Sequence, residues 1–528
     1  MPNRPAAVNA GSPQTLVAAA SRANLDGVFR STVRTWPERT AVEEGERALT
    51  YRELDRLVDG AAGWLAANGI GRGDRVAILS ENSTAYVALM LAAARTGCIL
   101  ACQNWRLTAR ELRHCISLVQ PKMTLVSDRF ATLLDEVDGP GGDGAGERHR
   151  LDDGLAARWS EAEPPAPSAS DDIDPEAILL ILYTSGTTGL PKGAAISHRA
   201  ELVRNVVWHL SFGVLPGDTM VDWMPLYHMG GADQVLGTLL GGGKVIVLEA
   251  FDAPRIARIA AREPLGWLVT MPGTTERMIA ALKAEPSPPM RVRAVGVMPD
   301  LVPRAEIAEL TSLLNAPYPN TFGSTETGSP PCSGSSLPPG VVPERLSKTL
   351  SPLCEVRLVD ADDQDVPDET PGEVAVRGPT LFSGYWRNDE TNGKDFRNGW
   401  FHLGDLMVRH ADGTFDFVDR AKYMIKSGGE NIYPAEIEQV LLADPRVAEA
   451  AVVRRTDPRW GEVPVAFVAR RDGEPLEDAD LFRRCRAELA GYKQPKGIRF
   501  LDFDDFPRSA SGKVQRHELE SLLANEET

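Results

Sequence analysis

The sequence predicts an α/β fold in which a large, multi-lobed N-terminal domain with parallel sheets precedes a smaller α/β C-terminal domain. Apolar, strand-like runs alternate with helical segments, which is the pattern of a parallel sheet covered on both faces. The chain has 528 residues, more than one hydrophobic core accommodates at about 150 residues per domain. A polar, turn-rich region at residues 352–404 predicts a small antiparallel part in the large domain.

The alternation begins in the first hundred residues. Thr50 and Glu53 have the spacing of a capping box, and apolar residues follow them at helical spacing, so a surface helix is expected to begin there. Residues 75–79 are typical of a short strand, and residues 82–96, rich in Ala and Leu, of a helix. Residues 138–175 are rich in Gly, Pro, Ser, Ala and Asp, which predicts a loose connection.

The second half of the chain contains a domain boundary. Strand-like runs return between residues 243 and 270, and the boundary is expected near residues 419–422. Beyond it, Pro434 opens a helix, and two short strands surround Val452 and Val465. We therefore expect three parts: a flexible tail at residues 1–24, an N-terminal domain at residues 25–420 and a C-terminal domain at residues 421–528.

Composition and charge exclude several classes of protein. A hydrophobic content of 43% and a charged content of 25% are globular averages, which excludes wholesale disorder. The formal net charge of -17 argues against binding to nucleic acid and to an anionic membrane surface. The six cysteines lack Cys-x-x-Cys spacing, which disfavours a metal cluster or a disulfide framework. Residues 1–21 lack the apolar core of a signal peptide or a membrane span, so we expect a cytoplasmic location.

The strongest functional signal is the segment at residues 183–193, which reads YTSGTTGLPKG. It follows an apolar run at residues 177–182 that is typical of a buried strand. Glycines let backbone N–H groups approach an anion, so the segment is expected to hold a polyphosphate. Its spacing, GxxGxPKG, differs from the GxxxxGK[ST] of P-loop NTPases and excludes that class. A plain polar surface turn is the alternative.

This segment resembles the signature of the adenylate-forming superfamily, which contains acyl-CoA synthetases, the adenylation domains of peptide synthetases and firefly luciferase. Further motifs of that family occur in the family's order, and the resemblance covers residues 25–519. These motifs are MPLYHMGG at 224–231, NTFGSTE at 320–326, FHLGD at 401–405, VDRAK at 418–422, IKSGGENIYP at 425–434 and PRSASGKV at 507–514. The resemblance implies an ATP-dependent acyl-CoA synthetase whose small C-terminal domain is mobile.

The resemblance implies a nucleotide site that uses ATP and Mg²⁺. Phe322 would stack on adenine, and Thr325 would contact the α-phosphate. Glu326 would hold Mg²⁺ beside Thr184, because a hard cation prefers oxygen ligands. The implied ATP-binding residues are Thr184, Ser185, Gly186, Thr187, Thr188, Gly189, Lys192, Asn320, Thr321, Phe322, Gly323, Thr325, Asp405, Arg420 and Lys513.

Two motifs near the domain boundary would complete the ribose site and the hinge. Asp405 would accept the ribose hydroxyls, although Leu403 stands where the family has threonine, a departure that leaves the local hydrogen bonding open. Arg420 would contact ribose and phosphate, and Lys422 would be the hinge. Isolated charges at a domain edge are usually just solvated, and the register with the other motifs favours the functional interpretation.

The C-terminal domain would supply the catalytic lysine and part of the CoA channel. Lys513 would contact both the substrate carboxylate and the α-phosphate region, since a cation is needed where two anions must approach each other. Thr184 and Glu326 complete the predicted catalytic set. Ser427, Gly428 and Gly429 would line the pantetheine channel after the domain rotates, where glycine lets the thin thiol arm pass close to the backbone.

The residues of the acyl site are the hardest to predict from the sequence. By resemblance, its lining would be His228, Gly231, Gly296, Val297, Met298 and Gly323. His228 would serve binding or gating between the carboxylate site and the thiol tunnel. Residues 296–300 read GVMPD where the family commonly has GGAP, which alters the shape of the pocket. No acidic group is evident to receive an amino group, so a hydrophobic acid is expected, whether medium-chain, long-chain, alicyclic or aryl.

The expected reaction forms acyl-AMP and pyrophosphate and then transfers the acyl group to CoA. One alternative is an acyl-AMP ligase that loads a separate acyl carrier protein. Another is a non-catalytic ATP-binding protein, which would be expected to have lost Lys513 or Glu326, whereas both are present. A homodimer is a further expectation.

Overall fold

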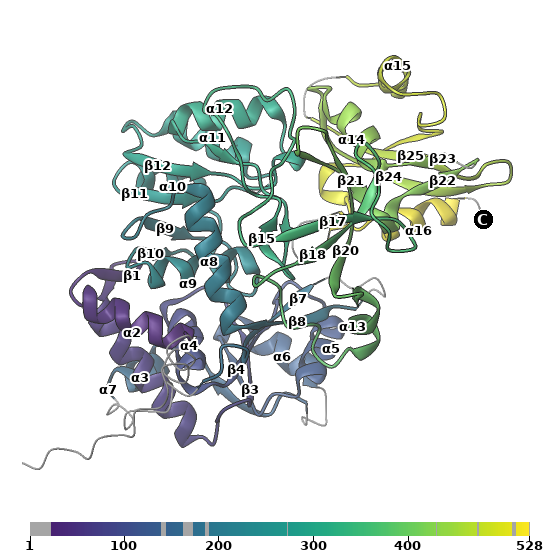
Figure 1. Ribbon diagram of the computed structural model, residues 1–528. Coiled ribbons are helices and arrows are strands. Elements are labelled where there is room, and N and C mark those ends of the chain that lie inside the picture. Colours follow the sequence, from purple (N-terminus) through teal and green to yellow (C-terminus); the bar gives the residue numbers. More distant parts are fainter. Residues whose placement is uncertain are drawn as a thin grey trace, which may run out of the picture.

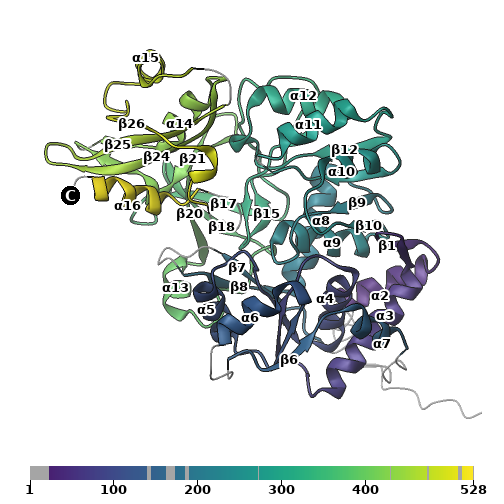
Figure 2. The same cartoon turned by 180° about the vertical axis from the view of Figure 1, so that it is seen from behind.

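The computed structural model describes residues 23–138, 144–161, 173–184, 190–271, 273–428, 430–471, 475–508 and 514–526. Two sheets with their helices lie next to each other, a smaller antiparallel sheet lies beside both, and the C-terminal domain lies beyond it (Figures 1 and 2). The predicted tail at residues 1–24 lies almost wholly outside the described residues. None of the described helices combines the length and the apolar content that a membrane crossing requires.

The first sheet has the strand order β6-β5-β3-β4-β7-β8. Its neighbouring strands are parallel except for β8, which runs antiparallel to β7. The predicted strand at residues 75–79 is confirmed as β3, and the apolar run before the phosphate segment is confirmed as β7. The strands are β3 (Arg75–Leu79), β4 (Ile99–Cys102), β5 (Met123–Val126), β6 (Glu147–Arg150), β7 (Ile178–Thr184) and β8 (Lys192–Ser197).

The second sheet has the strand order β12-β11-β9-β10-β1-β2. Strand β1 comes from the N-terminal part of the chain and pairs in parallel with β10, so the chain crosses between the two sheets. Only the edge strand β2 is antiparallel to its neighbour in this described sheet. The strands are β1 (Thr40–Glu44), β2 (Arg47–Thr50), β9 (Thr219–Asp222), β10 (Lys244–Val247), β11 (Pro264–Leu268) and β12 (Arg291–Val295).

Helices fill the space between the two sheets and cover their outer faces. One apolar cluster joins β3 and β7 to β9 and β10 through α2, α3, α4 and α9. A second cluster packs α10, α11 and α12 on the other face of the second sheet. The predicted capping box is confirmed at the start of α3, where Thr50 and Glu53 cap each other. The helices are α2 (Leu25–Thr35), α3 (Tyr51–Ala67), α4 (Thr84–Thr96), α5 (Ala109–Val119), α6 (Ala131–Asp138), α8 (His198–Phe212), α9 (Met229–Leu240), α10 (Ala253–Ala260), α11 (Thr275–Ala284) and α12 (Arg304–Leu314).

The predicted loose connection at residues 138–175 is wrong for its described part. This part contains β6, which extends the first sheet, and α7 (Asp153–Glu161), whose Trp159 is fully buried against α3. The high Gly and Pro content of the whole region favoured the prediction of a loop, although the short helix α7 lies within it. The rest of the predicted connection, at residues 139–143 and 162–172, lies outside the described residues.

The turn-rich region forms the predicted antiparallel part. Its sheet pairs β17 with β18, β18 with β20, and β20 with both β19 and β21. Two short strand pairs, β13 with β16 and β14 with β15, lie between this sheet and α12 in the chain. The elements are β13 (Tyr318–Pro319), β14 (Gly323–Ser324), β15 (Gly328–Pro331), β16 (Ser336–Leu337), β17 (Glu355–Val359), β18 (Gly372–Arg377), α13 (Asp389–Asp395), β19 (Phe396–Arg397), β20 (Trp400–Arg409) and β21 (Phe415–Arg420).

The C-terminal domain has apolar clusters of its own on the two faces of its sheet. The helix opened by Pro434 is confirmed as α14. The strands predicted around Val452 and Val465 are present, but they are long, at 11 and 10 residues, because they pair with each other along their whole length. Arg471 contacts the N-terminal domain, with its guanidinium 3.1 Å from Glu276 and 3.4 Å from Glu306. The elements are β22 (Ile425–Ser427), β23 (Glu430–Ile432), α14 (Pro434–Leu442), β24 (Val447–Asp457), β25 (Gly461–Arg470), α15 (Asp478–Glu488), β26 (Ile498–Phe500) and α16 (Arg516–Glu526).

A buried histidine at the start of α8 predicts sensitivity of the fold to acid. His198 is fully buried, and its Nδ1 accepts a hydrogen bond from the Leu25 N–H group at 3.3 Å. Burial lowers the pKa of His198 to about 4. Because the unfolded chain binds this proton at a higher pH than the folded chain, stability falls as the pH drops through the interval from about 6.5 to about 4.

Replacing His198 by glutamine therefore reduces the acid dependence. Between pH 7 and pH 5, the wild type loses about 2 kcal/mol more free energy of unfolding than His198→Gln. Urea denaturation at the two pH values measures this difference, whatever the absolute stability of the variant. His517→Gln, a change at an exposed residue of α16, serves as the control with wild-type pH dependence. Equal pH dependence of wild type and His198→Gln would contradict the prediction.

Candidate active site

The predicted phosphate segment begins at the carboxyl end of β7 and ends at the start of β8. Thr184 and Lys192 are opposite each other in the antiparallel register of these two strands. Ser185, Gly186, Thr187, Thr188 and Gly189 lie outside the described residues. The hydroxyl of Thr184 is buried and has no hydrogen-bond partner among the described residues. A buried hydroxyl without a partner is costly, and it is accounted for where an ion or ligand binds.

Lys192 and Glu326 meet around the ring of Tyr385. The Lys192 ammonium lies 3.7 Å from the centroid of that ring, a cation–π distance, and 3.8 Å from Asp395 Oδ2. The Tyr385 hydroxyl donates a hydrogen bond of 2.8 Å to Glu326 Oε1. Burial lowers the pKa of Lys192, and the carboxylates of Glu326 and Asp395 oppose this shift. The arrangement places a cation over the face of the Tyr385 ring and a carboxylate at its hydroxyl group.

Asp405 and Arg420 face each other on β20 and β21. They are register partners in the antiparallel pair, and Arg420 Nε lies 2.6 Å from Asp405 Oδ1. The Asp405 carboxylate raises the pKa of Arg420, and Glu326 adds to this shift. Leu403, which stands where the family has threonine, packs its side chain against two apolar clusters. The departure at that position is therefore accommodated by packing.

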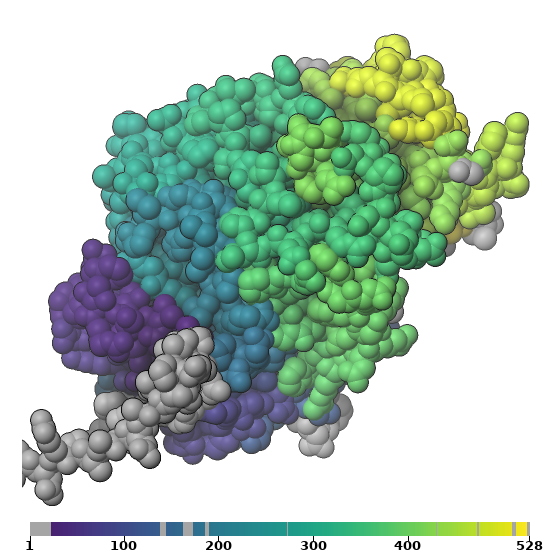
Figure 3. All heavy atoms as spheres, in the orientation of Figure 1, coloured from purple at the N-terminus to yellow at the C-terminus, as the bar shows by residue number. Residues whose placement is uncertain are grey.

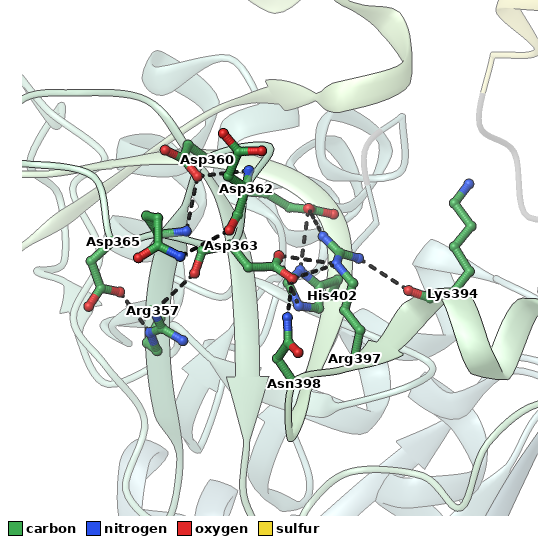
Figure 4. Close-up of polar contacts among 11 residues, drawn as sticks. Arg357, Asp360, Asp362, Asp363, Asp365, Lys394, Arg397, Asn398 and His402 are labelled. Carbon is green, nitrogen blue, oxygen red and sulfur yellow. Dashed lines mark hydrogen bonds and ion pairs between the residues drawn. The ribbon is translucent and has the colours of Figure 1, made fainter.

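The strand that carries Asp405 is anchored near its beginning by a polar network (Figure 4). His402 Nδ1 lies 3.3 Å from Glu373 Oε2. Arg397 lies 2.8 Å from Glu373 and 3.1 Å from Asp363. The Asn398 amide donates to Asp363 at 2.5 Å. These contacts tie the β19–β20 turn to the β17–β18 turn, so β20 is held at the end opposite its pairing with β21.

The NTFGSTE segment runs from β13 into β14. The ring of Phe322 packs against Phe417 with centroids 5.5 Å apart. The Thr325 carbonyl accepts a hydrogen bond of 3.0 Å from Arg204, a buried residue of α8. Arg204 also donates to the Thr380 carbonyl at 3.0 Å. A guanidinium from the large domain therefore fixes the backbone beside Glu326.

The residues predicted to line the acyl site have local structural roles. His228 caps α9, with its Nδ1 accepting from the Gly230 N–H group at 3.1 Å. A Cβ at Gly231 would lie 2.6 Å from the Pro225 carbonyl oxygen, and one at Gly296 would lie 2.1 Å from the Tyr318 ring. Gly296 also has a φ of +83°. Packing therefore requires glycine at both positions, and their predicted contact with the acyl group stays a prediction.

Val297 and Met298 continue this segment toward the NTFGSTE residues. Tyr318 donates its hydroxyl to the Val297 carbonyl at 2.7 Å, and the Met298 N–H group donates to Thr321 Oγ1 at 2.9 Å. Met298 has a φ of +52°. Gly323 lies in β14, where a Cβ would be 2.1 Å from the Gly328 carbonyl oxygen. The two segments thus form one connected surface.

The predicted hinge and CoA residues lie at the start of the C-terminal domain. Lys422 lies in a short 3₁₀ turn, and its carbonyl accepts from Arg454 at 2.9 Å. Ser427 ends β22, and Gly428 has a φ of +60° with the Trp460 ring 2.7 Å from where a Cβ would be. Gly429 and Lys513 lie outside the described residues. Their roles, like those of Lys422 and Gly428, stay predictions.

Sequence reasoning missed Tyr385, Asp395 and Arg204. Residues 383–386 add to the edge of β8, with Trp386 N–H donating to the Gly193 carbonyl at 2.7 Å, and this pairing brings Tyr385 beside Lys192. Such a non-local pairing leaves no local pattern. Arg204 lies in α8, a helix without a clear apolar face that buries His198 and Glu201 as well, so no periodic pattern in the sequence distinguishes it from a surface arginine.

Nucleotide and Mg²⁺ fit the residues that the structure brings together. The Thr184 hydroxyl, which has no partner within the described part of the chain, and the Glu326 carboxylate are oxygen donors of the type that Mg²⁺ prefers. Lys192 supplies an ammonium group beside them, which suits phosphate oxygens. The buried Asp405 carboxylate is an acceptor for hydroxyl groups.

Comparisons with known proteins match both parts of the chain. A family model described as AMP-binding enzyme matches residues 29–386, and one described as AMP-binding enzyme C-terminal domain matches residues 436–513. The indoleacetate–CoA ligase of Aromatoleum aromaticum is 34% identical over 500 residues, which cover 92% of this chain and 96% of that protein. A feruloyl-CoA synthase of an Amycolatopsis species is 34% identical over 508 residues, which cover 92% and 96%.

A solved structure extends the match to the whole fold. The o-succinylbenzoate CoA synthetase of Bacillus subtilis, in complex with its acyl-adenylate intermediate, superposes with a TM-score of 0.80 at 26% identity. The match covers 93% of this chain and 97% of that one. The expected α/β architecture with a separate C-terminal domain is thereby confirmed, and so is the expected acid–CoA ligase activity. The chain belongs to the AMP-binding enzyme family, within which it is an adenylate-forming acyl-CoA synthetase.

Proposed function

We propose that this synthetase activates a carboxylic acid that carries an aromatic ring. Relatives with 34% identity are an indoleacetate–CoA ligase and a feruloyl-CoA synthase, and the structural neighbour holds o-succinylbenzoyl-adenylate. Each of these acids has an aromatic ring. Val297 and Met298 place apolar side chains in the segment predicted to line the acyl site, which suits such a ring. Of the acids expected from the sequence, the aryl class is therefore favoured.

The first half reaction joins the acid to AMP. A carboxylate oxygen attacks the α-phosphorus of ATP, the bond to the β-phosphate oxygen breaks, and pyrophosphate leaves. Lys192 neutralises charge on the departing phosphates, and Lys513 brings the two anions together. Glu326 and Thr184 would hold Mg²⁺, which would supply further positive charge beside the phosphates. The observation that carries this assignment is the meeting of Lys192 and Glu326 around Tyr385, next to the Asp405–Arg420 pair.

In the second half reaction, the CoA thiolate attacks the acyl carbonyl carbon and AMP leaves. The C-terminal domain pivots about Lys422, so that Ser427, Gly428 and Gly429 line the thiol channel. Free CoA is the acceptor in this proposal, as it is by name for both relatives. Glycine is favoured at position 428 because the Trp460 ring lies 2.7 Å from where a Cβ would be.

A panel of acids tests the proposal. Pyrophosphate release and nucleotide products are measured with indole-3-acetate, ferulate, 2-succinylbenzoate, octanoate and palmitate, with CoA present. We expect AMP as the nucleotide product and a kcat/KM for the best aryl acid at least about tenfold above that for either fatty acid. Faster turnover of the fatty acids would contradict the substrate class, and ADP as product would contradict the adenylation step. An acyl carrier protein in place of CoA is expected to give no thioester.

A further inference from the structure

Lys348 is a buried lysine in the segment between β16 and β17. Its side chain is fully buried, and its ammonium group lies 2.7 Å from Asp300 Oδ2, 2.8 Å from Asn320 Oδ1 and 3.2 Å from the Leu346 carbonyl oxygen. These acceptors match the three N–H groups of an ammonium ion. A buried charge is tolerated only when it is paired and hydrogen-bonded, so this lysine is built into a specific position.

The partners of Lys348 belong to two segments of the proposed site. Asp300 lies in the 3₁₀ turn at residues 299–301, directly after the Gly296–Met298 segment, and Asn320 begins the NTFGSTE motif. A second link joins the same segments, because the Met298 N–H group donates to Thr321. Lys348 therefore bridges the two segments, because its ammonium group contacts a side chain of each.

The same lysine sets the orientation of the Asn320 carboxamide. Asn320 Nδ2 donates to the Leu346 carbonyl at 3.2 Å and to the Ser347 carbonyl at 2.9 Å, and its Oδ1 accepts from Lys348. The hydrogen-bond partners thus determine which side of the carboxamide carries the oxygen and which carries the nitrogen. The backbone of Lys348 is fixed as well, since it exchanges hydrogen bonds of 2.7 and 2.8 Å with Phe415 at the start of β21.

We propose that Lys348 is a positioning residue for the nucleotide, acting through Asp300 and Asn320. The inference rests on the proposed assignment of the NTFGSTE segment to the ATP site. Without the ammonium group, Asp300 would keep a largely buried carboxylate with no cation, and Asn320 would lose the donor that orients its amide. The turn at residues 299–301 could then move relative to the NTFGSTE segment. A displacement of about 1 Å in a binding site is enough to cost about a hundredfold in rate.

The test compares three variants by direct binding of AMP in titration calorimetry. Lys348→Met keeps the length of the side chain and removes its charge, and Lys348→Met/Asp300→Asn also removes the unpaired carboxylate. Lys283→Met is the matched control, because it removes an exposed lysine of α11 that pairs with Glu309. Thermal unfolding and the KM values for ATP and for the acid are measured on the same proteins.

We expect Lys348→Met to weaken AMP binding by about tenfold or more, to raise the KM for ATP more than the KM for the acid, and to lower the melting temperature. The double variant should recover much of the melting temperature but not the affinity for AMP. Lys283→Met should behave as wild type.

Two results would overturn the proposal. One is a folded Lys348→Met protein with wild-type affinity for AMP, and the other is a double variant that recovers affinity together with stability, as a purely structural pair would. If Lys348→Met does not fold, the double variant decides the question. A wild-type protein that binds no AMP would instead overturn the proposed nucleotide site, and this inference with it.

Discussion

Replacing Lys513 by alanine is expected to slow acyl-AMP formation by about a hundredfold or more. The substrate carboxylate and the α-phosphate are both anionic, and in-line attack spreads further negative charge over phosphoryl oxygens. An ammonium group lowers that barrier only in the first half reaction. Transfer of the acyl group from supplied acyl-AMP to CoA should therefore continue near the wild-type rate. Pyrophosphate release measures the first step, and thioester formation from synthetic acyl-AMP measures the second.

A matched variant separates this effect from a general loss of positive charge on the C-terminal domain. Arg483 is an exposed cation on α15 that pairs with Asp480 at 3.1 Å. Arg483→Ala should leave both half reactions unchanged. If Lys513→Ala slowed acyl-AMP formation and acyl transfer to CoA equally, the proposal that the two half reactions use different positions of the C-terminal domain would be refuted. The prediction rests on the PRSASGKV motif, because Lys513 lies outside the described residues.

Replacing Glu326 by glutamine is expected to reduce kcat/KM for ATP by about a hundredfold at limiting Mg²⁺. Glutamine has the same shape and can still accept the hydrogen bond from the Tyr385 hydroxyl, so the local structure should persist. The lost negative charge weakens the proposed Mg²⁺ site, since the cation prefers carboxylate oxygen. Excess Mg²⁺ should recover part of the activity. Steady-state rates over a Mg²⁺ titration measure both effects.

Tyr385→Phe is the control for the hydrogen bond itself. It removes the hydroxyl that Glu326 accepts from and keeps the ring that faces the Lys192 ammonium. We expect less than about a tenfold loss of activity, because the net contribution of one hydrogen bond is small. The Mg²⁺ requirement should be unchanged, because the Glu326 carboxylate is retained. Chelation of Mg²⁺ should abolish the wild-type activity. A Glu326→Gln enzyme with the wild-type Mg²⁺ dependence would exclude this carboxylate as a metal ligand.

The motifs of the candidate site could be located from the sequence because each is a short, continuous run. The phosphate segment directly follows an apolar run, and NTFGSTE is a continuous segment that contains β14, so local order along the chain was enough to locate both. The structure places Asp405 and Arg420 opposite each other on β20 and β21, and their roles at the ribose and phosphate stay predictions. The prediction failed at residues 138–175, where composition suggested a loop and a buried tryptophan stabilises α7.

The sequence by itself determined the class of fold, the positions of a minority of its strands and helices, such as β3, β7, α3 and α14, and the family. Capping boxes, apolar periodicity and glycine–hydroxyl runs each depend on residues that are close together in the sequence, so the sequence alone is enough to recognise them. Only the tertiary structure decided that Tyr385 joins Lys192 to Glu326, that Arg204 holds the Thr325 backbone and that Lys348 links Asp300 to Asn320. These contacts arise where segments that are distant in the sequence pair at sheet edges or pack in the interior. Local sequence patterns do not determine which distant segments come into contact.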